Sequence, residues 1–259
     1  MIRILFFGDI FGRPGRTGVK NFLETKKDTI RPDFVIANSD NIASGRGPTE
    51  NTYQELIDAG IDVLTCGDHV WDQKEVVNIL EKKSSKLIRP ANYPKMDAGR
   101  GFIECEVKGQ KVLIVSMLGR VWTTEGLESP FVIADEIISA SKAKIIFVDF
   151  HGEATSEKCA FGHYLAGRVS AVIGTHTHVQ TSDEKILDEK TAYLTDAGFC
   201  GPVDSIIGVK KELSIKRFLS GVPINFEVAD GTAQINGVIL DIDEKTGETV
   251  KIERINELV

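Results

Sequence analysis

Residues 2–14, IRILFFGDIFGRP, carry the pattern that decides the fold class. Ile2–Phe7 is a short apolar run that ends in Gly8 and Asp9, which predicts a buried strand followed directly by a polar turn. Pro14 suits the first turn of a helix, and apolar residues recur along one face of the segment after it. The chain is therefore predicted to begin with a strand and then a helix.

The same alternation continues over the first ninety residues. Further strands are predicted at Phe34–Ala37 and Ile61–Cys66, a helix is predicted after the candidate N-cap Thr49, and another helix over Gln73–Lys82. Alternating strands and helices predict a sheet with helices packed on it. In such a sheet, ligands bind just past the carboxyl ends of the strands. Three carboxylates stand at that edge: Asp9, Asp40 and Asp68.

The rest of the chain predicts a second sheet. Residues 101–107 and 111–117 flank the turn sequence KGQ and predict a hairpin. Two apolar strands, Lys144–Asp149 and Ala171–Gly174, run directly into histidine-containing segments, and the last quarter has the alternation of antiparallel strands. Because no repeat, low-complexity segment or linker interrupts the chain, we expect an α/β fold with a single domain over residues 1–259.

The composition excludes several classes of protein. The net charge is −7 and no basic stripe is present, which argues against non-specific binding to nucleic acid. The four cysteines lie far apart without a C-x-x-C pair, as in a reduced cytosolic chain rather than a disulfide framework or a thiolate metal site. The apolar run at the N-terminus is too short for a signal peptide or a membrane span. We therefore expect a cytoplasmic protein with no membrane partner.

Five polar clusters follow predicted strands. They are GD at 8–9, DN at 40–41, GDH at 67–69, FHGE at 150–153 and THTH at 175–178. Together they offer carboxylate, carboxamide and imidazole ligands without a thiolate, which suits iron, manganese or zinc. Any one cluster alone is commonly a turn, a helix cap or a hydrogen-bonded core histidine. Five in succession favour a metal site, and their number exceeds the needs of one tetrahedral zinc, which predicts two ions.

The pair His176 and His178 is the most informative of these clusters. Alternate residues of a strand project to the same side, so both imidazoles are predicted to point from one strand end toward one site. The remaining histidine, His163, is expected to be structural or exposed. Trp71 and Trp122 could stack on a nucleobase, but core packing is the stronger expectation for each.

Eight sequence blocks occur in a fixed order along the chain: GDIFGRPGR, NSDN, GDHVWD, RPANYP, DFHGEATSEK, GTHTHVQTSDE, TDAGFCGP and NGVILDIDEKTG. Together they closely resemble the YmdB-like branch of the calcineurin-type metallophosphoesterases, over essentially the whole chain. The resemblance implies a four-layer sandwich of two β-sheets flanked by helices. It also implies a bacterial hydrolase of cyclic nucleotides with two divalent metal ions, iron being favoured and manganese the alternative.

The resemblance also assigns roles to individual residues. One ion would be held by Asp9, Asn41 and His178, the other by Asp68, His151 and His176, with Asp40 bridging the two. His69 would lie close by as the catalytic acid and not as a ligand. The D-x-H motif of the wider superfamily is absent because position 11 is Phe, and Asn41 is the implied compensating ligand.

Two residues depart from the pattern of the branch. Asp40 stands where the branch usually has Glu, and Asp68 replaces the Asn of its G-N-H motif. The second change adds a negative charge, and a unit charge about 4 Å away is worth on the order of 4 kcal/mol at a surface-like dielectric. A phosphate would therefore be held less strongly and the metal more tightly, and His69 should stay protonated to higher pH. These effects oppose one another, so the net effect on rate has no predicted sign.

The predicted reaction is metal-assisted hydrolysis of a phosphodiester. Two ions would activate a hydroxide and neutralise the phosphoryl oxygens, while His69 protonates the departing ribose oxygen of a 2′,3′-cyclic nucleotide such as 2′,3′-cAMP. Two alternatives stay open: a broad phosphomonoesterase or nucleotidase on the same site, and a weakly active regulatory protein that senses a nucleotide or RNA. The expected partner is a small phosphoester. Members of the family often form homo-oligomers, but no sequence pattern locates an interface.

Overall fold

The apolar run near the start of the chain forms β1 (Ile2–Phe7), which is buried on both faces. Successive side chains of a strand point to opposite faces of the sheet. Ile4 and Phe6 therefore pack into the core between two sheets, whereas Leu5 and Phe7 pack under the helices that cover the outer face. This two-sided burial explains why the run is apolar throughout instead of alternating with polar residues.

The first sheet has seven strands in the part of the chain that the computed structural model describes, residues 1–95 and 98–259. The strand order is β2-β11-β12-β1-β3-β4, with β13 paired to β12. Their bounds are Asp9–Ile10 for β2, Phe34–Asn38 for β3, Val63–Thr65 for β4, Phe199–Pro202 for β11, Ala233–Ile242 for β12 and Thr249–Leu258 for β13. Strands β1, β3 and β4 are parallel, as the alternation with helices predicts.

The second sheet has six strands in the order β5-β6-β7-β8-β10-β9. Their bounds are Phe102–Val107 for β5, Gln110–Leu118 for β6, Ile145–His151 for β7, Ala171–Thr175 for β8, Lys185–Leu187 for β9 and Thr191–Leu194 for β10. The predicted hairpin is β5 and β6, and its turn residues Lys108 and Gly109 both have positive φ, at 49° and 76°. That conformation suits the twist of a two-residue hairpin.

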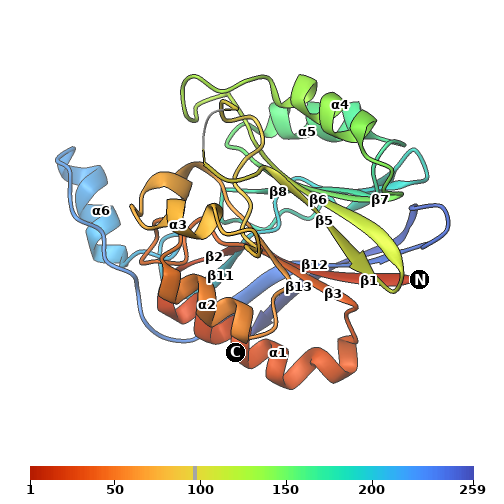
Figure 1. The fold of residues 1–259 in the computed structure, drawn as a ribbon. Coiled ribbons are helices and arrows are strands. Elements are labelled where there is room, and N and C mark those ends of the chain that lie inside the picture. Colours follow the sequence, from red (N-terminus) through yellow and green to blue (C-terminus); the bar gives the residue numbers. More distant parts are fainter. Residues whose placement is uncertain (96–97) are drawn as a thin grey trace.

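Helices cover the outer faces of both sheets (Figure 1). The first sheet carries α1 (Gly12–Ile30), α2 (Glu50–Asp58) and α3 (Val76–Leu80), and the second carries α4 (Pro130–Ala140) and α5 (Thr155–Leu165). Thr49 caps α2 as predicted, because its side chain accepts a hydrogen bond from the backbone N–H of Thr52. The expected four-layer arrangement, with two sheets between helices, is confirmed.

The segment after β4 differs from the prediction. The sequence predicts a helix over Gln73–Lys82, but the chain forms a 3₁₀ turn over Asp68–Trp71 and only then the short helix α3. The buried carboxylate of Asp40 accepts the backbone N–H groups of Gly67, at 2.6 Å, and of His69, at 3.1 Å. These bonds tighten the chain around a carboxylate that follows the neighbouring strand β3, a long-range effect that local periodicity does not encode.

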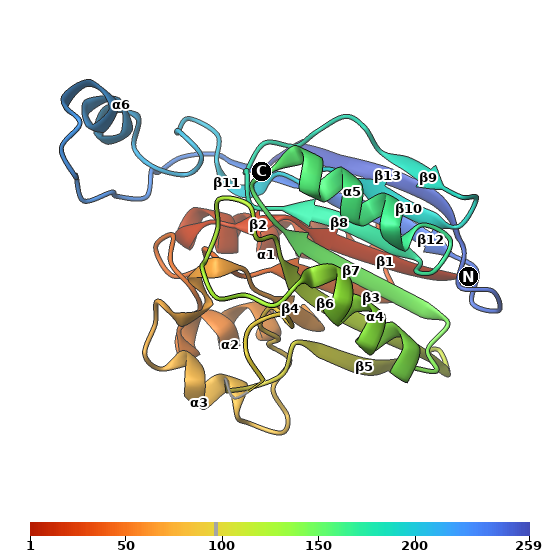
Figure 2. The ribbon, with the colours of Figure 1, turned by 90° about the horizontal axis from the view of Figure 1, so that it is seen from above.

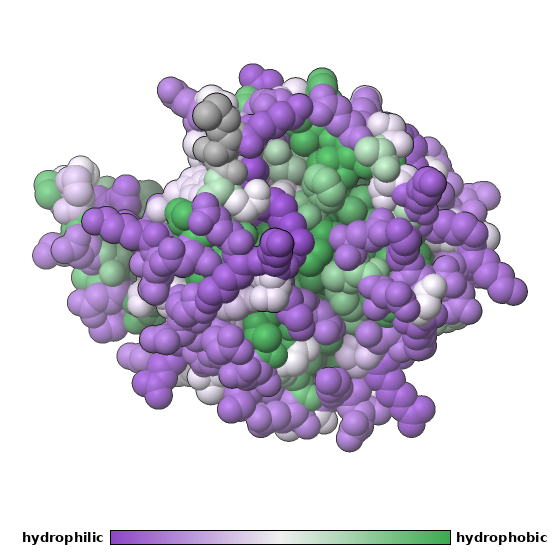
Figure 3. Space-filling view, in the orientation of Figure 1, coloured by the Kyte–Doolittle hydropathy of each residue, from purple (hydrophilic) through white to green (hydrophobic). Residues whose placement is uncertain are grey.

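The last quarter is only partly as predicted. Strands β12 and β13 form the expected antiparallel pair, but α6 (Lys211–Ser220) precedes them and projects away from the sandwich (Figures 1 and 2). Figure 3 shows hydrophobic atoms among hydrophilic ones on this projection, where Phe218 and Leu219 are each 84% exposed. None of the helices in the described part of the chain combines the length and the apolar character needed to cross a bilayer.

Candidate metal centre

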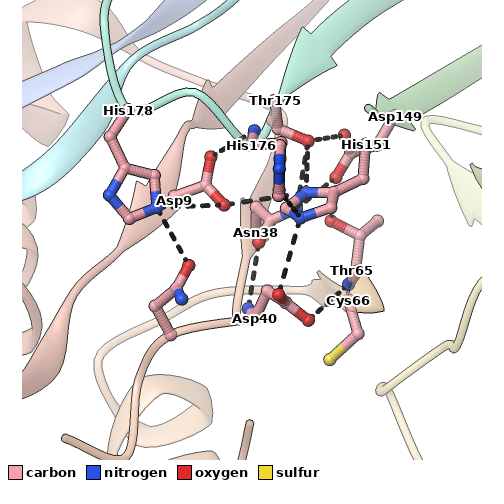
Figure 4. Close-up of polar contacts among 12 residues, drawn as sticks. Asp9, Asn38, Asp40, Thr65, Cys66, Asp149, His151, Thr175, His176 and His178 are labelled. Atoms are coloured by element: carbon pink, nitrogen blue, oxygen red, sulfur yellow. Dashed lines mark hydrogen bonds and ion pairs between the residues drawn. The ribbon is translucent and has the colours of Figure 1, made fainter. Parts of the chain in front are cut away.

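The predicted ligands come from both sheets and lie close together, and Figure 4 shows the contacts among Asp9, Asp40, His151, His176 and His178. From the first sheet, Asp9 opens β2, and others follow β3 and β4; from the second, His151 ends β7 and two histidines follow β8. The seven residues form two groups. The His151 group consists of Asp40, Asp68, His151 and His176, and the His178 group consists of Asp9, Asn41 and His178.

The His151 group brings four donor atoms together. His151 Nε2 lies 3.0 Å from His176 Nδ1, 3.2 Å from Asp68 Oδ1 and 3.5 Å from Asp40 Oδ2. Nitrogen and oxygen ligands bind a divalent ion at roughly 2.0–2.2 Å, so two ligands of one ion lie roughly 3 to 3.5 Å apart. The spacing of this group therefore fits one divalent cation. Gly67 is required beside it, because a Cβ there would lie 2.3 Å from His151 Nε2.

The His178 group is smaller and more deeply buried. His178 Nε2 lies 3.2 Å from Asn41 Oδ1 and 3.9 Å from Asp9 Oδ1. Asp9 is fully buried, and its Oδ1 has no hydrogen-bond partner among the residues that the structure describes. A buried carboxylate oxygen without a partner is costly unless a cation or donor meets it. Asp9 lies between His178 and His151 (Figure 4), so a cation at this oxygen would also neighbour the His151 group.

The imidazoles are oriented by acceptors on their outward nitrogens. His178 Nδ1 lies 3.0 Å from the carbonyl oxygen of Ile207, and His176 Nε2 lies 3.1 Å from Glu153 Oε2. Because these oxygens accept hydrogen bonds, the ring proton sits on that nitrogen and the other nitrogen offers its lone pair to the centre. Metal-binding histidines are usually held in this way.

His151 is oriented by a buried network that sequence reasoning missed. Its Nδ1 lies 2.9 Å from Thr175 Oγ1, and that hydroxyl donates to Asp149 Oδ1 at 2.7 Å. Asp149 also accepts hydrogen bonds from Thr65 and Asn38, so it joins both sheets beneath the centre. The available signal was a single acidic residue inside the apolar run of β7.

The shifted pKa values of the buried carboxylates and imidazoles show that the centre lacks positive charge. Burial raises the pKa of Asp9 well above its ordinary value and that of Asp40 to about 7. Burial also lowers the pKa of His151 and His178 to about 4, which keeps both imidazoles neutral with a lone pair available. Buried carboxylates beside neutral imidazoles form a donor set that suits a divalent cation.

A protein-family model described as a YmdB-like protein matches residues 5–255. The chain belongs to the YmdB-like family. A Bacillus subtilis (strain 168) protein named 2′,3′-cyclic-nucleotide 2′-phosphodiesterase is 46% identical over 256 residues, which cover 98% of this chain and 96% of that protein.

Two solved structures extend the comparison. A hypothetical protein from Thermus thermophilus has a TM-score of 0.94 at 41% identity, with 99% of both chains covered. A structure titled a novel phosphatase, from Mycoplasma pneumoniae, has a TM-score of 0.94 at 36% identity, covering 99% of this chain and 93% of that chain. The metallophosphoesterase-type fold that the resemblance implied is therefore confirmed for this YmdB-like chain.

His69 lies at the rim of the His151 group in this YmdB-like fold. Its backbone N–H donates to Asp40, and its Nδ1 lies 3.0 Å from Asp72 Oδ2. Burial alone would lower the pKa of His69, but the carboxylates of Asp40 and Asp68 and the contact with Asp72 raise it above its ordinary value. Its ring also comes within ligand range of Asp40 and Asp68, so this geometry permits either an acid or a ligand.

The expectation that His176 and His178 occupy alternate positions of a strand is wrong. Strand β8 ends at Thr175, and both histidines lie beyond it with left-handed backbones, at φ 103° and 64°. The two imidazoles therefore diverge, one joining His151 and the other joining Asn41. Left-handed conformations are uncommon outside glycine and persist only where the surroundings hold them.

The other aromatic and histidine candidates fall outside the centre. Trp71 packs against Tyr93 with ring centroids 5.7 Å apart, as expected for a core residue. Trp122 is 84% exposed, so the expectation of core packing is wrong for it. It lies in the connection between β6 and α4. His163 is exposed on α5, in agreement with its prediction.

Proposed function

We propose that this chain is a metal-dependent phosphodiesterase that hydrolyses 2′,3′-cyclic nucleotides, with 2′,3′-cAMP as the favoured substrate. As a YmdB-like protein it is a phosphoric ester hydrolase. The observation that carries the proposal is the unpartnered, fully buried Oδ1 of Asp9, which lies 3.9 Å from His178 Nε2 and 3.7 Å from His151 Nδ1. The cyclic-nucleotide substrate is transferred from the Bacillus subtilis relative at 46% identity.

Two divalent ions, with iron favoured over manganese, would be held by the two groups. The His151 group would hold one ion and the His178 group the other, with Asp40 bridging between them. Bound divalent ions supply Lewis acidity, which neutralises the phosphoryl oxygens and lowers the pKa of water toward neutrality. Carboxylate and imidazole ligands without thiolate match iron and manganese.

His69 is the proposed general acid. Because Asp72 accepts the hydrogen of Nδ1, the proton available for transfer is the one on Nε2. Hydrolysis breaks the bond between phosphorus and the ribose O2′, the oxygen of water joins the phosphorus, and O2′ takes a proton from His69. Cleavage of the 2′ ester leaves a nucleoside 3′-monophosphate. An alkoxide leaving group departs poorly without that proton, which is why a positioned acid contributes to the rate.

The experiment that tests this function combines metal analysis with turnover. The purified chain is analysed for bound metal and then assayed on 2′,3′-cAMP across added Fe²⁺ and Mn²⁺. About two ions per chain with metal-dependent formation of 3′-AMP is the expected result. A chain that binds no metal after reconstitution contradicts the proposal, and two ions without turnover favour the nucleotide-sensing alternative.

A phosphomonoesterase is the second candidate, and the Mycoplasma pneumoniae structure titled a phosphatase, at 36% identity, favours it. The same two ligand groups would serve either reaction, because both need the phosphoryl oxygens neutralised. The same preparation is assayed on 3′-AMP and 5′-AMP beside the cyclic diester. Turnover of the monoesters that exceeds turnover of 2′,3′-cAMP would establish this second function.

A further inference from the structure

Lys158 and Asp196 form a fully buried ion pair that the proposed chemistry does not use. Lys158 Nζ lies 2.6 Å from Asp196 Oδ2, and each side chain is 1% exposed. Lys158 comes from α5 and Asp196 from the segment after β10, within the sequence blocks DFHGEATSEK and TDAGFCGP. A buried ion pair is costly to desolvate, and removing one partner leaves an uncompensated buried charge.

The carboxylate of Asp196 gathers donors from the segment that carries the two site histidines. Its Oδ2 accepts the backbone N–H of Thr177 at 3.0 Å and the hydroxyl of Thr177 at 2.8 Å, in addition to Lys158. Its Oδ1 accepts the backbone N–H of Gly198 at 2.8 Å. Gly198 in turn accepts the backbone N–H of Asp9 at 3.0 Å, so the same carboxylate reaches a residue of the His178 group.

Lys158 and the backbone of Asp196 hold the two ends of this segment. Lys158 Nζ donates to the carbonyl oxygen of Thr175 at 2.6 Å, just before the first histidine. The backbone N–H of Thr181 donates to the carbonyl oxygen of Asp196 at 3.1 Å, and the Thr181 hydroxyl accepts the backbone N–H of Asp196 at 2.9 Å. The segment 175–181 is thus held at its start, at Thr177 between the histidines, and at its end.

We propose that Lys158 and Asp196 are positioning residues that hold His176 and His178 in their left-handed backbones, so that one imidazole faces each ligand group. The two conformations need external support, because neither residue is a glycine. Thr177, which lies between them, is the residue that Asp196 binds twice. The inference rests on the proposed function only in taking both histidines as metal ligands.

Mn²⁺ binding by the chelator-treated full chain tests the proposal without relying on turnover. Asp196→Asn and the charge-neutral double variant K158M/D196N are titrated with Mn²⁺, and free Mn²⁺ is followed by electron paramagnetic resonance. An amide accepts hydrogen bonds on one side only, so it cannot serve the donors on both Oδ1 and Oδ2. Residues that orient metal ligands typically change affinity about 10- to 100-fold, and a loss of that size is expected at both sites.

A matched control separates positioning from general destabilisation. Phe161 lies on α5 with Lys158, but its ring packs against Phe131 and Phe150, with centroids 5.3 Å and 4.3 Å away, in the core under α4 and α5. Phe161→Leu should lower the unfolding midpoint while keeping the Mn²⁺ affinity of the wild type. Thr177→Val removes the hydroxyl bond to Asp196 and the long bond from the Val179 N–H, at 3.4 Å, but no charge. It therefore keeps the test open if the charge variants do not fold, and an affinity about 2- to 10-fold weaker is expected.

The outcomes are distinct. Wild-type Mn²⁺ affinity in folded Asp196→Asn and Thr177→Val variants overturns the proposal, as does an equal loss of affinity in Phe161→Leu. A wild-type chain that itself binds no Mn²⁺ or Fe²⁺ contradicts the proposed function instead. Weak binding in the Asp196 and Thr177 variants beside tight binding in wild type and Phe161→Leu supports the positioning role.

Discussion

The two ligand groups of the centre differ in access and in charge. In the His151 group, Asp68 and His176 are 24% and 23% exposed, and two carboxylates stand beside two imidazoles. In the His178 group, Asp9 and His178 are 0% and 7% exposed, with one carboxylate and one carboxamide. His178 is also enclosed by aromatic rings: Phe199 is stacked on it at 5.4 Å, and Phe11 meets it edge-on at 5.6 Å.

The group expected to bind its cation more tightly is therefore also the one more open to solvent. The His151 group carries more negative charge, so it should hold its cation more tightly, but it lies open to solvent and to His69. The His178 group offers fewer charges in a closed, apolar-walled site. A substrate phosphoryl group would therefore approach from the side of the His151 group, and the ion of the His178 group would be retained mainly by burial.

The largest effect is expected from substitution of Asp40, which is proposed to bridge the two ions. Asp40→Ala should release both ions and lower kcat/KM on 2′,3′-cAMP by about 10³-fold or more, because the ions supply several kcal/mol of transition-state stabilisation. His178→Ala should release one ion only. Metal content and turnover are measured together, with the exposed Asp28→Ala as the control. Loss of a single ion in Asp40→Ala would show that Asp40 belongs to the His151 group alone.

His69→Ala tests whether the His151 group contains a further ligand. The proposed acid role predicts a loss of about 10²- to 10⁴-fold in kcat, while both ions stay bound. His69 stands within ligand range of Asp40 and Asp68, so the alternative is concrete. If the variant loses one ion, His69 is a ligand of the His151 group and the acid must be sought elsewhere.

Local patterns singled out the polar clusters that contain the residues of both groups but not the way they are held. Apolar runs that lead into polar turns mark strand ends directly, whereas the choice of seven ligands within the clusters came from the family resemblance and stays a prediction. The left-handed backbones of His176 and His178 could not be predicted, because they depend on contacts with Asp196, far along the chain. The contacts of Asp149 with Thr65 and Asn38 cross between sheets, and no local period encodes how two sheets meet.

Asp68→Asn tests the effect of charge, because it removes the carboxylate that the His151 group has in excess of the His178 group. The ion of the His151 group should bind more weakly, while the ion of the His178 group is unchanged. The KM for 2′,3′-cAMP should fall by about fivefold or more, since a unit charge about 4 Å away is worth about 1 kcal/mol in water and on the order of 4 kcal/mol at a surface-like dielectric. Titrations with Mn²⁺ and steady-state kinetics report the two effects separately. A large gain in turnover would show a site detuned toward sensing, and an unchanged KM would mean that the extra charge is already compensated.

The last expected effect concerns the stability of the metal-free chain, in which each group contains a carboxylate with a raised pKa. Asp40 has a pKa of about 7, and that of Asp9 lies well above its ordinary value. Each carboxyl group binds its proton more tightly in the fold than in the unfolded chain, so its stabilisation is lost as the pH rises through the folded pKa. The lowered pKa values of His151 and His178, about 4, act only below pH 6.5.

Above pH 6.5 the raised pKa values of Asp9 and Asp40 therefore both lower the stability of the fold as the pH rises. The raised pKa of His69 lowers it further. The free energy of unfolding of the chelator-treated chain should fall by about 1 to 3 kcal/mol between pH 6.5 and 8.5. Urea denaturation at several pH values measures it.

Asp40→Asn should remove the part of the slope that belongs to the His151 group, and Asp9→Asn the part that belongs to the His178 group. Saturating Mn²⁺ should abolish or reverse the slope, because metal binding favours the ionised carboxylates. A metal-free chain whose stability is constant or rises over this range would mean that the buried carboxylates already have their countercharge within the protein, which would remove the electrostatic reason for placing a cation at either group.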